Sequence, residues 1–285
     1  MCKSSLLRNL LASPDALLMP DAYDPLSARI IESLGFKAVQ CSGHSFALAA
    51  CCPSEAEFGF ERNLALTKSI VEAVGVPVMA DGEDGFGDPP VVAETVRSFL
   101  RAGVAGINLE DQVLGQAGAK RVVDRSLMIE KIHAAREAAR QEGQPELVIN
   151  GRTDALAAAS DRNAGLSESI ARANLYLEAG ADLAFVAGVV TLAEVKTLVG
   201  GIHGPVSIAA GLPYNIDEMS VADLIACGVA RVSLPVVAIF SAIQAIRRTL
   251  ASLRDSQDFS AIRRENLLCS SDDISRLLAP HSRSS

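Results

Sequence analysis

The feature that most constrains the fold is a strand-then-helix alternation that repeats eight times. Short β-branched or apolar runs are separated by longer segments rich in Ala, Glu, Lys and Arg with helical spacing. Several of these segments end in Gly just before the next run, as in "IESLGFKAV" and "YLEAGADLA", which is typical of a glycine C-cap leading into a buried parallel strand. The eight runs cover residues 16–24, 38–45, 76–84, 105–111, 146–154, 181–188, 204–211 and 230–235.

Eight such units within about 250 residues predict a (β/α)₈ barrel, the TIM-type α/β fold. A doubly wound sheet is the competing architecture. It usually has a glycine-rich phosphate turn after its first strand, and "MPDAYDPLSA" at residues 19–28 is not such a turn. The chain has no linker or low-complexity stretch. We therefore expect one barrel domain over residues 1–285, with extra C-terminal helices over residues 236–280.

Composition restricts the expected partners. The formal net charge is −8, whereas a nucleic-acid-binding surface needs clustered Lys and Arg to meet the phosphates. No apolar run approaches the roughly 18 residues of a membrane span. The six cysteines have no metal-ligand spacing, which favours reduced thiols. These patterns predict a cytoplasmic protein that binds a small molecule and neither nucleic acid nor a membrane.

Polar side chains gather where five of the predicted strands end. The third strand runs into "MADGEDGFGDPP" at residues 79–90, which places four carboxylates within eight residues. Because the C-terminal ends of the strands meet at one mouth of a barrel, the polar residues of strands one to five are expected to converge there. They are Asp21, Tyr23, Asp24, Ser42, His44, Asp81, Glu83, Asp84, Glu110, Asp111, Asn150, Arg152 and Asp154.

Crowded carboxylates repel each other unless they are protonated or neutralised, so this cluster indicates a bound divalent cation. Oxygen ligands without His or Cys at metal spacing favour Mg²⁺, with Mn²⁺ as a substitute. An EF-hand is excluded, because the twelfth position counted from Asp81 is Val92. A plain turn remains the alternative, since Asp and Gly are common turn residues. Arg152 faces the acidic group and is suited to hold a substrate carboxylate or phosphonate.

Six motifs together carry a resemblance to a known family. They read "PDAYDPLSARIIESLGFKAV", Ser42-Gly43, "ADGEDGFGD", "GINLEDQ", "GRTDA" and "EAGADLAFV". Over roughly residues 8–250 their order and spacing resemble the isocitrate lyase/phosphoenolpyruvate mutase superfamily. The resemblance implies a (β/α)₈ barrel, commonly a homotetramer with C-terminal helices exchanged between neighbours, which here is the segment 236–280. It also implies Mg²⁺-dependent cleavage or formation of C–C or C–P bonds next to a 2-oxo or 2-hydroxy carboxylate.

The resemblance further implies roles for individual residues. Asp81 is expected to bind the metal directly, with Glu83 and Glu110 acting through metal-bound water. The residues expected to bind substrate are Ser42 and the Gly43 amide for one carboxylate, Arg152 for the other anionic group, Tyr23 on the wall, and Asn150. The candidate catalytic residues are Arg152, Glu110, His44 and Tyr23.

Departures from the family pattern narrow the function. Isocitrate and methylisocitrate lyases place a Cys and a His on the mobile loop after strand four, whereas residues 112–124 here contain neither, so isocitrate lyase activity is not expected. Lys120 on this loop could reach a substrate carboxylate or simply be solvated. Ser54 stands where many members have Asp; either Glu55 or Glu57 substitutes for that Asp, or its role is absent. Two further departures are Glu83 in place of Asp and Ala187 in place of a strand-six Glu.

His44 is open to two interpretations: an acid or base near neutral pH, or a loop histidine that caps the backbone. The leading functional hypothesis is a Mg²⁺-dependent lyase that cleaves a C–C bond, by retro-aldol cleavage or decarboxylation, in a small 2-oxo or 2-hydroxy di- or tricarboxylic acid through a metal-stabilised enolate. One alternative is a phosphonopyruvate-type C–P mutase or hydrolase. Another is a barrel that binds a 2-oxo acid and a metal without turnover. A homo-oligomer, a tetramer or a dimer, is expected in each case.

Overall fold

The computed structural model describes residues 2–114 and 120–279, and its strands form one closed, parallel barrel in sequence order. The predicted (β/α)₈ architecture is confirmed, and each of the eight predicted runs contains a strand. Pairing of β1 with β8, with Leu17 opposite Arg231, closes the barrel. The strands are β1 (Leu17–Ala22), β2 (Val39–Cys41), β3 (Val78–Asp81), β4 (Gly106–Glu110), β5 (Val148–Thr153), β6 (Leu183–Val186), β7 (Val206–Ala209) and β8 (Arg231–Leu234).

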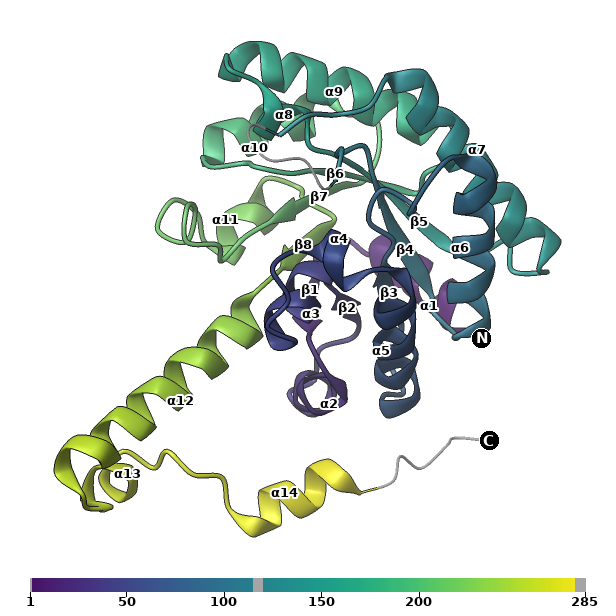
Figure 1. Ribbon diagram of the computed structural model, residues 1–285. Coiled ribbons are helices and arrows are strands. Elements are labelled where there is room, and N and C mark those ends of the chain that lie inside the picture. Colours follow the sequence, from purple (N-terminus) through teal and green to yellow (C-terminus); the bar gives the residue numbers. More distant parts are fainter. Residues whose placement is uncertain (1, 115–119, 280–285) are drawn as a thin grey trace.

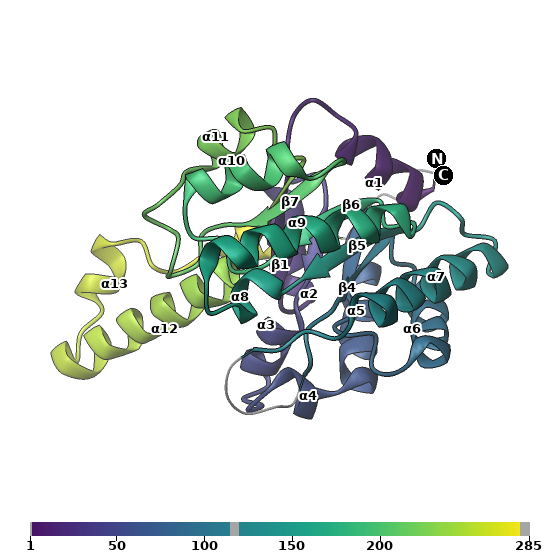
Figure 2. The same cartoon turned by 90° about the horizontal axis from the view of Figure 1, so that it is seen from above.

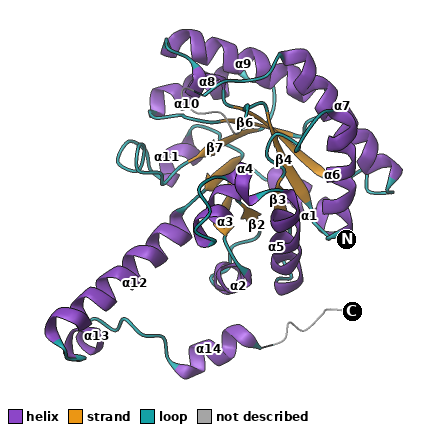
Figure 3. Cartoon of the chain, viewed as in Figure 1, coloured by secondary structure: helices purple, strands orange, loops and turns teal. Residues whose placement is uncertain are grey.

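Helices surround the barrel in the described part of the chain (Figure 2 and Figure 3). Two of the predicted glycine caps are present, at Gly35 with φ of +87° and at Gly180 with φ of +106°, a left-handed conformation that glycine adopts without strain. The helices are α1 (Lys3–Leu11), α2 (Pro25–Ser33), α3 (Gly43–Ala49), α4 (Glu55–Phe58), α5 (Phe60–Ala73), α6 (Pro89–Arg101), α7 (Arg125–Gln141), α8 (Ala155–Ala158), α9 (Arg162–Glu178), α10 (Leu192–Gly201), α11 (Val221–Ala226), α12 (Val237–Ser256), α13 (Ser260–Arg264) and α14 (Ser271–Leu278).

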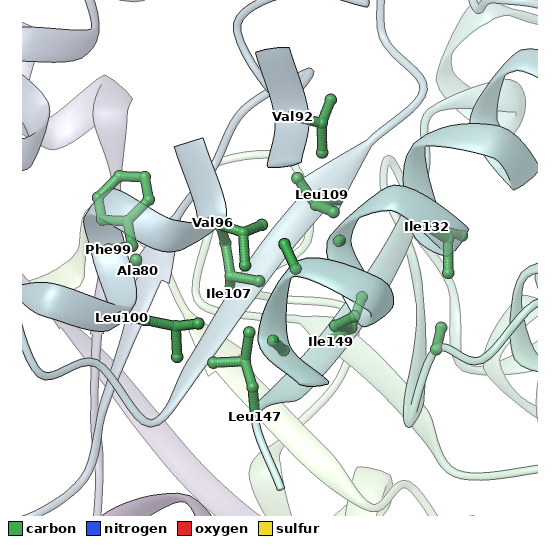
Figure 4. Packing of buried hydrophobic residues seen from close by; sticks show 14 of the residues in the cluster. Ala80, Val92, Val96, Phe99, Leu100, Ile107, Leu109, Ile132, Leu147 and Ile149 are labelled. Atoms are coloured by element: carbon green, nitrogen blue, oxygen red, sulfur yellow. The ribbon is translucent and has the colours of Figure 1, made fainter. Parts of the chain in front are cut away.

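The outer core lies between the strands and the helices that cover them. Figure 4 shows one part of it, where side chains of α6 and α7 pack on the outward faces of β4 and β5. Val96 and Phe99 of α6 are fully buried there, as are Ile107 and Ile149 of the strands. Burial of each such side chain contributes about 1.5–3 kcal/mol, so these contacts hold the strand ends in fixed positions.

The side chains inside the barrel change from apolar to polar along the barrel axis. At the N-terminal end, Leu7 and Leu11 of α1 pack with inward side chains such as Leu17, Met79 and Leu183, which makes an apolar plug. Towards the C-terminal end the inward residues become polar and charged, and most of them are buried; they include Asp21, Gln40, Asp81, Asn108, Glu110, Asn150 and Arg231. The polar chemistry is therefore confined to the mouth where the strands end.

The C-terminal helices leave the barrel. In Figure 1, α12 extends away from β8, and α13 and α14 follow at its far end. Several apolar side chains of α12 are exposed, among them Phe240, Ile243, Ile246 and Leu250. The chain returns near α2, where Arg29 Nε donates to the Leu277 carbonyl at 2.6 Å. Within the described residues, no helix combines the length and apolarity that a membrane crossing requires.

Candidate active site

A cavity of about 510 Å³ opens at the C-terminal ends of the strands. Its position is the one where barrels of this kind hold their active sites. Five of the polar residues predicted to converge line it: Ser42, His44, Asp81, Glu110 and Arg152. The predicted convergence of the polar ends of strands one to five is supported by the geometry for strands two to five, whereas none of Asp21, Tyr23 and Asp24 of strand one lines this cavity.

Three carboxylates form a compact, buried cluster beside this cavity. Asp81 ends β3, Glu83 follows two residues later, and Glu110 ends β4. One ligand oxygen from each lies within 4.8 Å of the others, and the three residues are 7%, 3% and 2% exposed. They are the three predicted metal ligands, and their separation lets a single ion contact all of them.

The backbone around Glu83 is built to hold this cluster. The loop is joined to β4 by two hydrogen bonds, from Gly82 N to the Asn108 carbonyl at 3.0 Å and from Glu110 N to the Glu83 carbonyl at 2.9 Å. A Cβ at Gly82 would lie 2.5 Å from the Asn108 carbonyl oxygen, so only glycine allows this approach. Glu83 itself has a φ of +50°, an uncommon value for a residue with a side chain. Strain of this kind concentrates at functional sites.

Electrostatics at the cluster favours a cation. Burial raises the pKa of Glu83 well above its usual range, and neighbouring Asp81 and Glu55 raise it further. Burial also raises the pKa of Glu110 well above its usual range, although Arg152 opposes this. A divalent ion removes the repulsion by neutralising the carboxylates. The donor set, three carboxylates at one buried point, fits Mg²⁺ or Mn²⁺, which prefer oxygen ligands.

Arg152 separates two acidic groups. Its Nη1 lies 2.7 Å from Glu110 Oε2, and its Nε and Nη2 donate to the two oxygens of Asp154 at 2.8 and 3.1 Å. Burial works against the charge on Arg152, but Asp154 and Glu110 raise its pKa well above its usual value. Two of its five N–H donors thus make hydrogen bonds to Asp154, and Nη1 is ion-paired with Glu110, while the residue also lines the cavity in which a ligand would lie.

Lys120 is the second cation that pairs with Asp154. Its Nζ lies 2.7 Å from Asp154 Oδ1, and it also contacts Gln112. Lys120 lines the cavity, but its ammonium group is paired with Asp154, so it is neither merely solvated nor a free cation. The rest of the loop 112–124, on which the missing Cys and His were noted, includes residues 115–119, which lie outside the described residues.

Asp154 owes its position to a buried network behind the strands. Asp111 is fully buried and accepts hydrogen bonds from Thr153 Oγ1 at 2.7 Å and from the Asp154 backbone N–H at 2.9 Å. Arg172 and the Tyr176 hydroxyl donate to Asp111 from α9, at 3.0 and 2.7 Å. Asp111 is therefore a supporting residue, and sequence position alone did not separate it from the carboxylates that face the cavity.

His44 and Glu55 face each other at the rim. His44 Nδ1 lies 3.7 Å from Glu55 Oε1, and both residues line the cavity. Burial raises the pKa of Glu55, and the nearby charge of Asp81 raises it further. Ser54 only caps α4, since its side chain accepts from Glu57 N at 3.2 Å. Of the two glutamates that could substitute for the family's Asp, Glu55 is the one that faces the site.

Ser42 and Gly43 lie at the start of α3, next to the carboxylates. Ser42 lines the cavity and caps the helix by accepting from Ser45 N at 3.4 Å. The Gly43 N–H donates to Asp81 Oδ2 at 2.9 Å, so in this structure it orients a predicted metal ligand. The contact of this amide with a substrate carboxylate stays a prediction.

Two predicted site residues lie elsewhere. The turn after β1, in which Tyr23 N donates to Ser27 Oγ at 3.0 Å, directs Tyr23 away from the barrel mouth, and its side chain lines a groove beside Phe46 and Ile239. Asn150 is fully buried and donates to Asn108 Oδ1 at 2.5 Å; it is not a lining residue of the cavity. The structure thus places neither residue against the cavity, and Asn108 occupies the position expected for Asn150.

Sequence reasoning missed Gln40 and Asn108, both of which line the cavity. Each lies two residues before a predicted site residue, at Ser42 and Glu110, and therefore faces the same side of its strand. That alternation is the signal that could have found them. The alternation was not used because residues that point into a barrel below its mouth are usually apolar.

Replacement of Gly43 by Ala is expected to disrupt the acidic cluster. A Cβ at Gly43 would lie 1.6 Å from Glu83 Oε1, so Glu83 must move. We expect Mg²⁺ affinity, measured by calorimetry, to fall by about tenfold or more, since displaced metal contacts typically cost this much. Gly200→Ala is the matched control, because a Cβ there meets nothing within 4 Å. Equal Mg²⁺ affinity in Gly43→Ala and the unmodified protein would show that Glu83 is not a ligand.

Comparison with known proteins places this site in a family. The family model described as phosphoenolpyruvate phosphomutase matches residues 7–254, which include every strand of the barrel and the acidic cluster. The chain belongs to this family. The superfamily predicted from the strand-end motifs is thereby confirmed.

Several named relatives of the chain are lyases, and one is a carboxyvinyl-carboxyphosphonate phosphorylmutase of Arabidopsis thaliana. The chain is similar to 2,3-dimethylmalate lyase of Eubacterium barkeri, with 36% identity over 185 residues that are 63% of this chain and 61% of that protein, and so less than two thirds of its length. It is also similar to 2-methylisocitrate lyase of Halalkalibacterium halodurans, with 30% identity over 252 residues, 87% of this chain and 81% of that protein. Among solved structures, phosphonopyruvate hydrolase in complex with oxalate and Mg²⁺ matches with a TM-score of 0.85 at 26% identity, covering 97% of this chain and 95% of the other.

Proposed function

We propose that this protein is a Mg²⁺-dependent carbon–carbon lyase that acts on a small 2-oxo or 2-hydroxy dicarboxylic acid. The observation that carries the proposal is the buried cluster of Asp81, Glu83 and Glu110 beside a cavity that also contains Arg152. A metal site and an arginine that share one cavity suit an acid with two anionic groups. The names of the lyases to which the chain is similar support the same reaction class.

Each residue has a defined task in this proposal. Asp81, Glu83 and Glu110 hold the ion, which when bound supplies Lewis-acid stabilisation of negative charge on the 2-oxo or 2-hydroxy oxygen. The Ser42 hydroxyl donates to the carboxylate next to that oxygen. Arg152 uses the N–H groups that do not bind Asp154 to hold the second carboxylate. The cavity walls exclude water, which strengthens these interactions.

Retro-aldol cleavage of a 2-hydroxy acid needs a base and an acid. The hydroxyl gives up its proton, the C2–C3 bond breaks, and its electron pair moves to C3, where the adjacent carboxylate delocalises it. A proton delivered to C3 completes the products, a 2-oxo acid and a carboxylic acid. In decarboxylation the substrate is a 2-oxo dicarboxylic acid. The C3–C4 bond breaks, CO₂ leaves, and the resulting enolate is protonated at C3.

His44 with Glu55 is our candidate for delivering that proton. The described residues of the loop 112–124 contain no Cys or His for the task, and neither do residues 115–119 in the sequence. His44 lines the cavity and has Glu55 as its partner, whose carboxylate stabilises the protonated ring.

C–P chemistry on a phosphonopyruvate-like acid is the second candidate. The matching family model and the similarity to phosphonopyruvate hydrolase favour it. Such a substrate has the same two anionic ends, so it would use the same metal cluster and Arg152. The product distinguishes the two candidates.

A substrate panel tests the proposed function. We expect a 2-oxo acid or CO₂ to be released from at least one 2-oxo or 2-hydroxy dicarboxylate in MgCl₂, and activity to be lost in EDTA and restored by Mg²⁺ or Mn²⁺. Release of inorganic phosphate from phosphonopyruvate alone would favour C–P chemistry. Binding of oxalate with Mg²⁺ but no turnover of any panel member would favour a binding protein and contradict the lyase proposal.

We also propose a homo-oligomer in which the segment 236–280 packs on a neighbouring subunit. The exposed apolar side chains of α12 support this, because they form a stripe that a partner can cover. Light scattering is expected to give the mass of a tetramer or a dimer. The double substitution Ile246→Asp and Leu250→Asp is expected to lower the mass to that of a monomer. A monomeric mass for the unmodified protein would contradict the proposal.

A further inference from the structure

We propose that the preferred substrate is a dicarboxylate with an alkyl substituent at C3, and that the site selects against a third carboxylate at that position. This inference rests on the proposed function and narrows its substrate class. It is carried by the division of the described cavity lining into a charged half, from β2 to β5, and an uncharged, mostly apolar half, from β6 to β8, in which Tyr214 and Ser233 are the polar residues.

The apolar half is formed by the ends of three strands and the segments that follow them. We call it the apolar wall: Phe185, Ala187, Ala209, Leu212, Pro235 and Val236. Four of these residues are less than 9% exposed. A wall of this kind gains free energy by removing hydrocarbon from water. The side-chain hydrogen-bond donors beside it are the hydroxyls of Tyr214 and Ser233, and neither group is a cation that could neutralise a carboxylate.

Arg152 stands at the border between the two halves. Its guanidinium carbon lies 5.4 Å from the centre of the Phe185 ring. A dicarboxylate held at one end by the metal cluster and at the other by Arg152 therefore has its C3 substituent next to the apolar wall. That substituent is the part of the substrate that the wall can recognise.

Positive charge is already committed in the described part of the cavity. Its lining cations are Arg152, paired with Glu110 and Asp154, and Lys120, paired with Asp154. His44, which is charged only if protonated, faces Glu55 at the opposite rim. Residues 115–119 contain no charged residue in the sequence. A third carboxylate would have to displace one of these ion pairs or lie against hydrocarbon.

Arg231 on β8 does not supply the missing cation. Its guanidinium is fully buried one layer below the cavity, where Nη1 donates to Ser207 Oγ at 3.1 Å and Nη2 donates to Gln40. Gln40 and Ser233 line the cavity above it. Their neutral groups can accept or donate a hydrogen bond but do not neutralise a carboxylate, and an unpaired charge is costly to bury.

The test compares two substrates of the same shape. 3-Isobutylmalate and isocitrate differ only in having two methyl groups in place of two carboxylate oxygens on the C3 substituent, and malate is the unsubstituted reference. Binding is measured by calorimetry in MgCl₂, and cleavage is followed by 2-oxo acid release. We expect 3-isobutylmalate to bind about tenfold or more tightly than malate, and isocitrate to bind more weakly than malate. Isocitrate binding as tightly as 3-isobutylmalate, or no binding of any of the three, would overturn the inference.

A positive charge placed on the apolar wall is expected to shift the relative affinities of 3-isobutylmalate and isocitrate in favour of isocitrate. Ala187→Lys should shift the affinity ratio towards isocitrate by about tenfold or more, and Ala209→Lys serves if the first variant does not fold. Ala193→Lys on exposed α10 adds the same charge away from the cavity and should leave the ratio unchanged. An unchanged ratio in the wall variants would refute the assignment of the wall. The expected binding order without cleavage of any compound would contradict the proposed function and leave the substrate inference standing.

Discussion

Asp81→Asn is expected to reduce kcat/KM by about three orders of magnitude or more and to abolish measurable Mg²⁺ binding at millimolar concentrations. The change removes one charge from the centre of the metal cluster, and Lewis-acid stabilisation of the transition state is typically worth several kcal/mol. The side chain keeps its size, so the hydrogen bond from Gly43 N can be retained through the amide oxygen. Activity on the best panel substrate and calorimetric titration with MgCl₂ are the measurements.

Asp84→Asn is the matched control for this prediction. Asp84 lies three residues along the same loop, outside the metal cluster, and its Oδ1 accepts from Phe86 N at 2.9 Å, a bond that asparagine preserves. We expect wild-type Mg²⁺ affinity and activity within about twofold. Equal losses in both variants would mean that the loop as a whole, and not the Asp81 charge, supports the activity.

Arg152→Met is expected to lower the free energy of unfolding by about 3–5 kcal/mol at pH 7, because it leaves Glu110 buried without its cation and Asp154 with Lys120 alone. Burial opposes the ionisation of Asp154, but Arg152 and Lys120 lower its pKa below the usual 3.8. A carboxylate with a lowered pKa contributes stability above its unfolded pKa and loses it as the pH falls through the folded pKa. Urea unfolding at pH 7 therefore measures the contribution of Asp154 in full.

Two further variants separate the stabilising role of Arg152 from its role in binding. Arg152→Lys keeps the charge but not the planar fork, so we expect most of the stability to return while affinity for a dicarboxylate stays low. Arg101→Met removes a pair with Glu142 of 3.0 Å on the surface and should change stability by less than about 0.5 kcal/mol. An Arg152→Met variant as stable as Arg101→Met would contradict the central position assigned to Arg152.

The barrel could be predicted from sequence because its signals are local and repeated. Each strand is a short apolar run, and residues such as Gly35 and Gly180 mark the helix ends that precede the strands. The metal cluster could be predicted for a related reason: the position of a residue at a strand end already fixes which mouth of the barrel it reaches. Asp81 and Glu110, at the ends of β3 and β4, therefore converge, and the loop that follows Asp81 brings Glu83 to them.

The placements that the motifs did not predict depend on contacts distant in sequence. Asn150 lies opposite Asn108 in the pairing of β4 with β5, but of these two residues Asn108 is the one that lines the cavity. Tyr23 follows β1 directly, but the capping turn at Ser27 directs it towards α12. Glu55 lies next to His44 because α4 packs at the rim of the cavity, and the sequence alone does not predict that packing. These placements depend on packing that no short motif encodes.

The most direct test of the central claim is the position of a bound ion. Crystals of the protein grown with MnCl₂ and oxalate should give one anomalous difference peak between the carboxylates of Asp81, Glu83 and Glu110, and the peak should be absent from crystals of Asp81→Asn. A manganese peak elsewhere in the barrel, or none at all with oxalate present in the cavity, would contradict the metal site on which the proposed reaction depends.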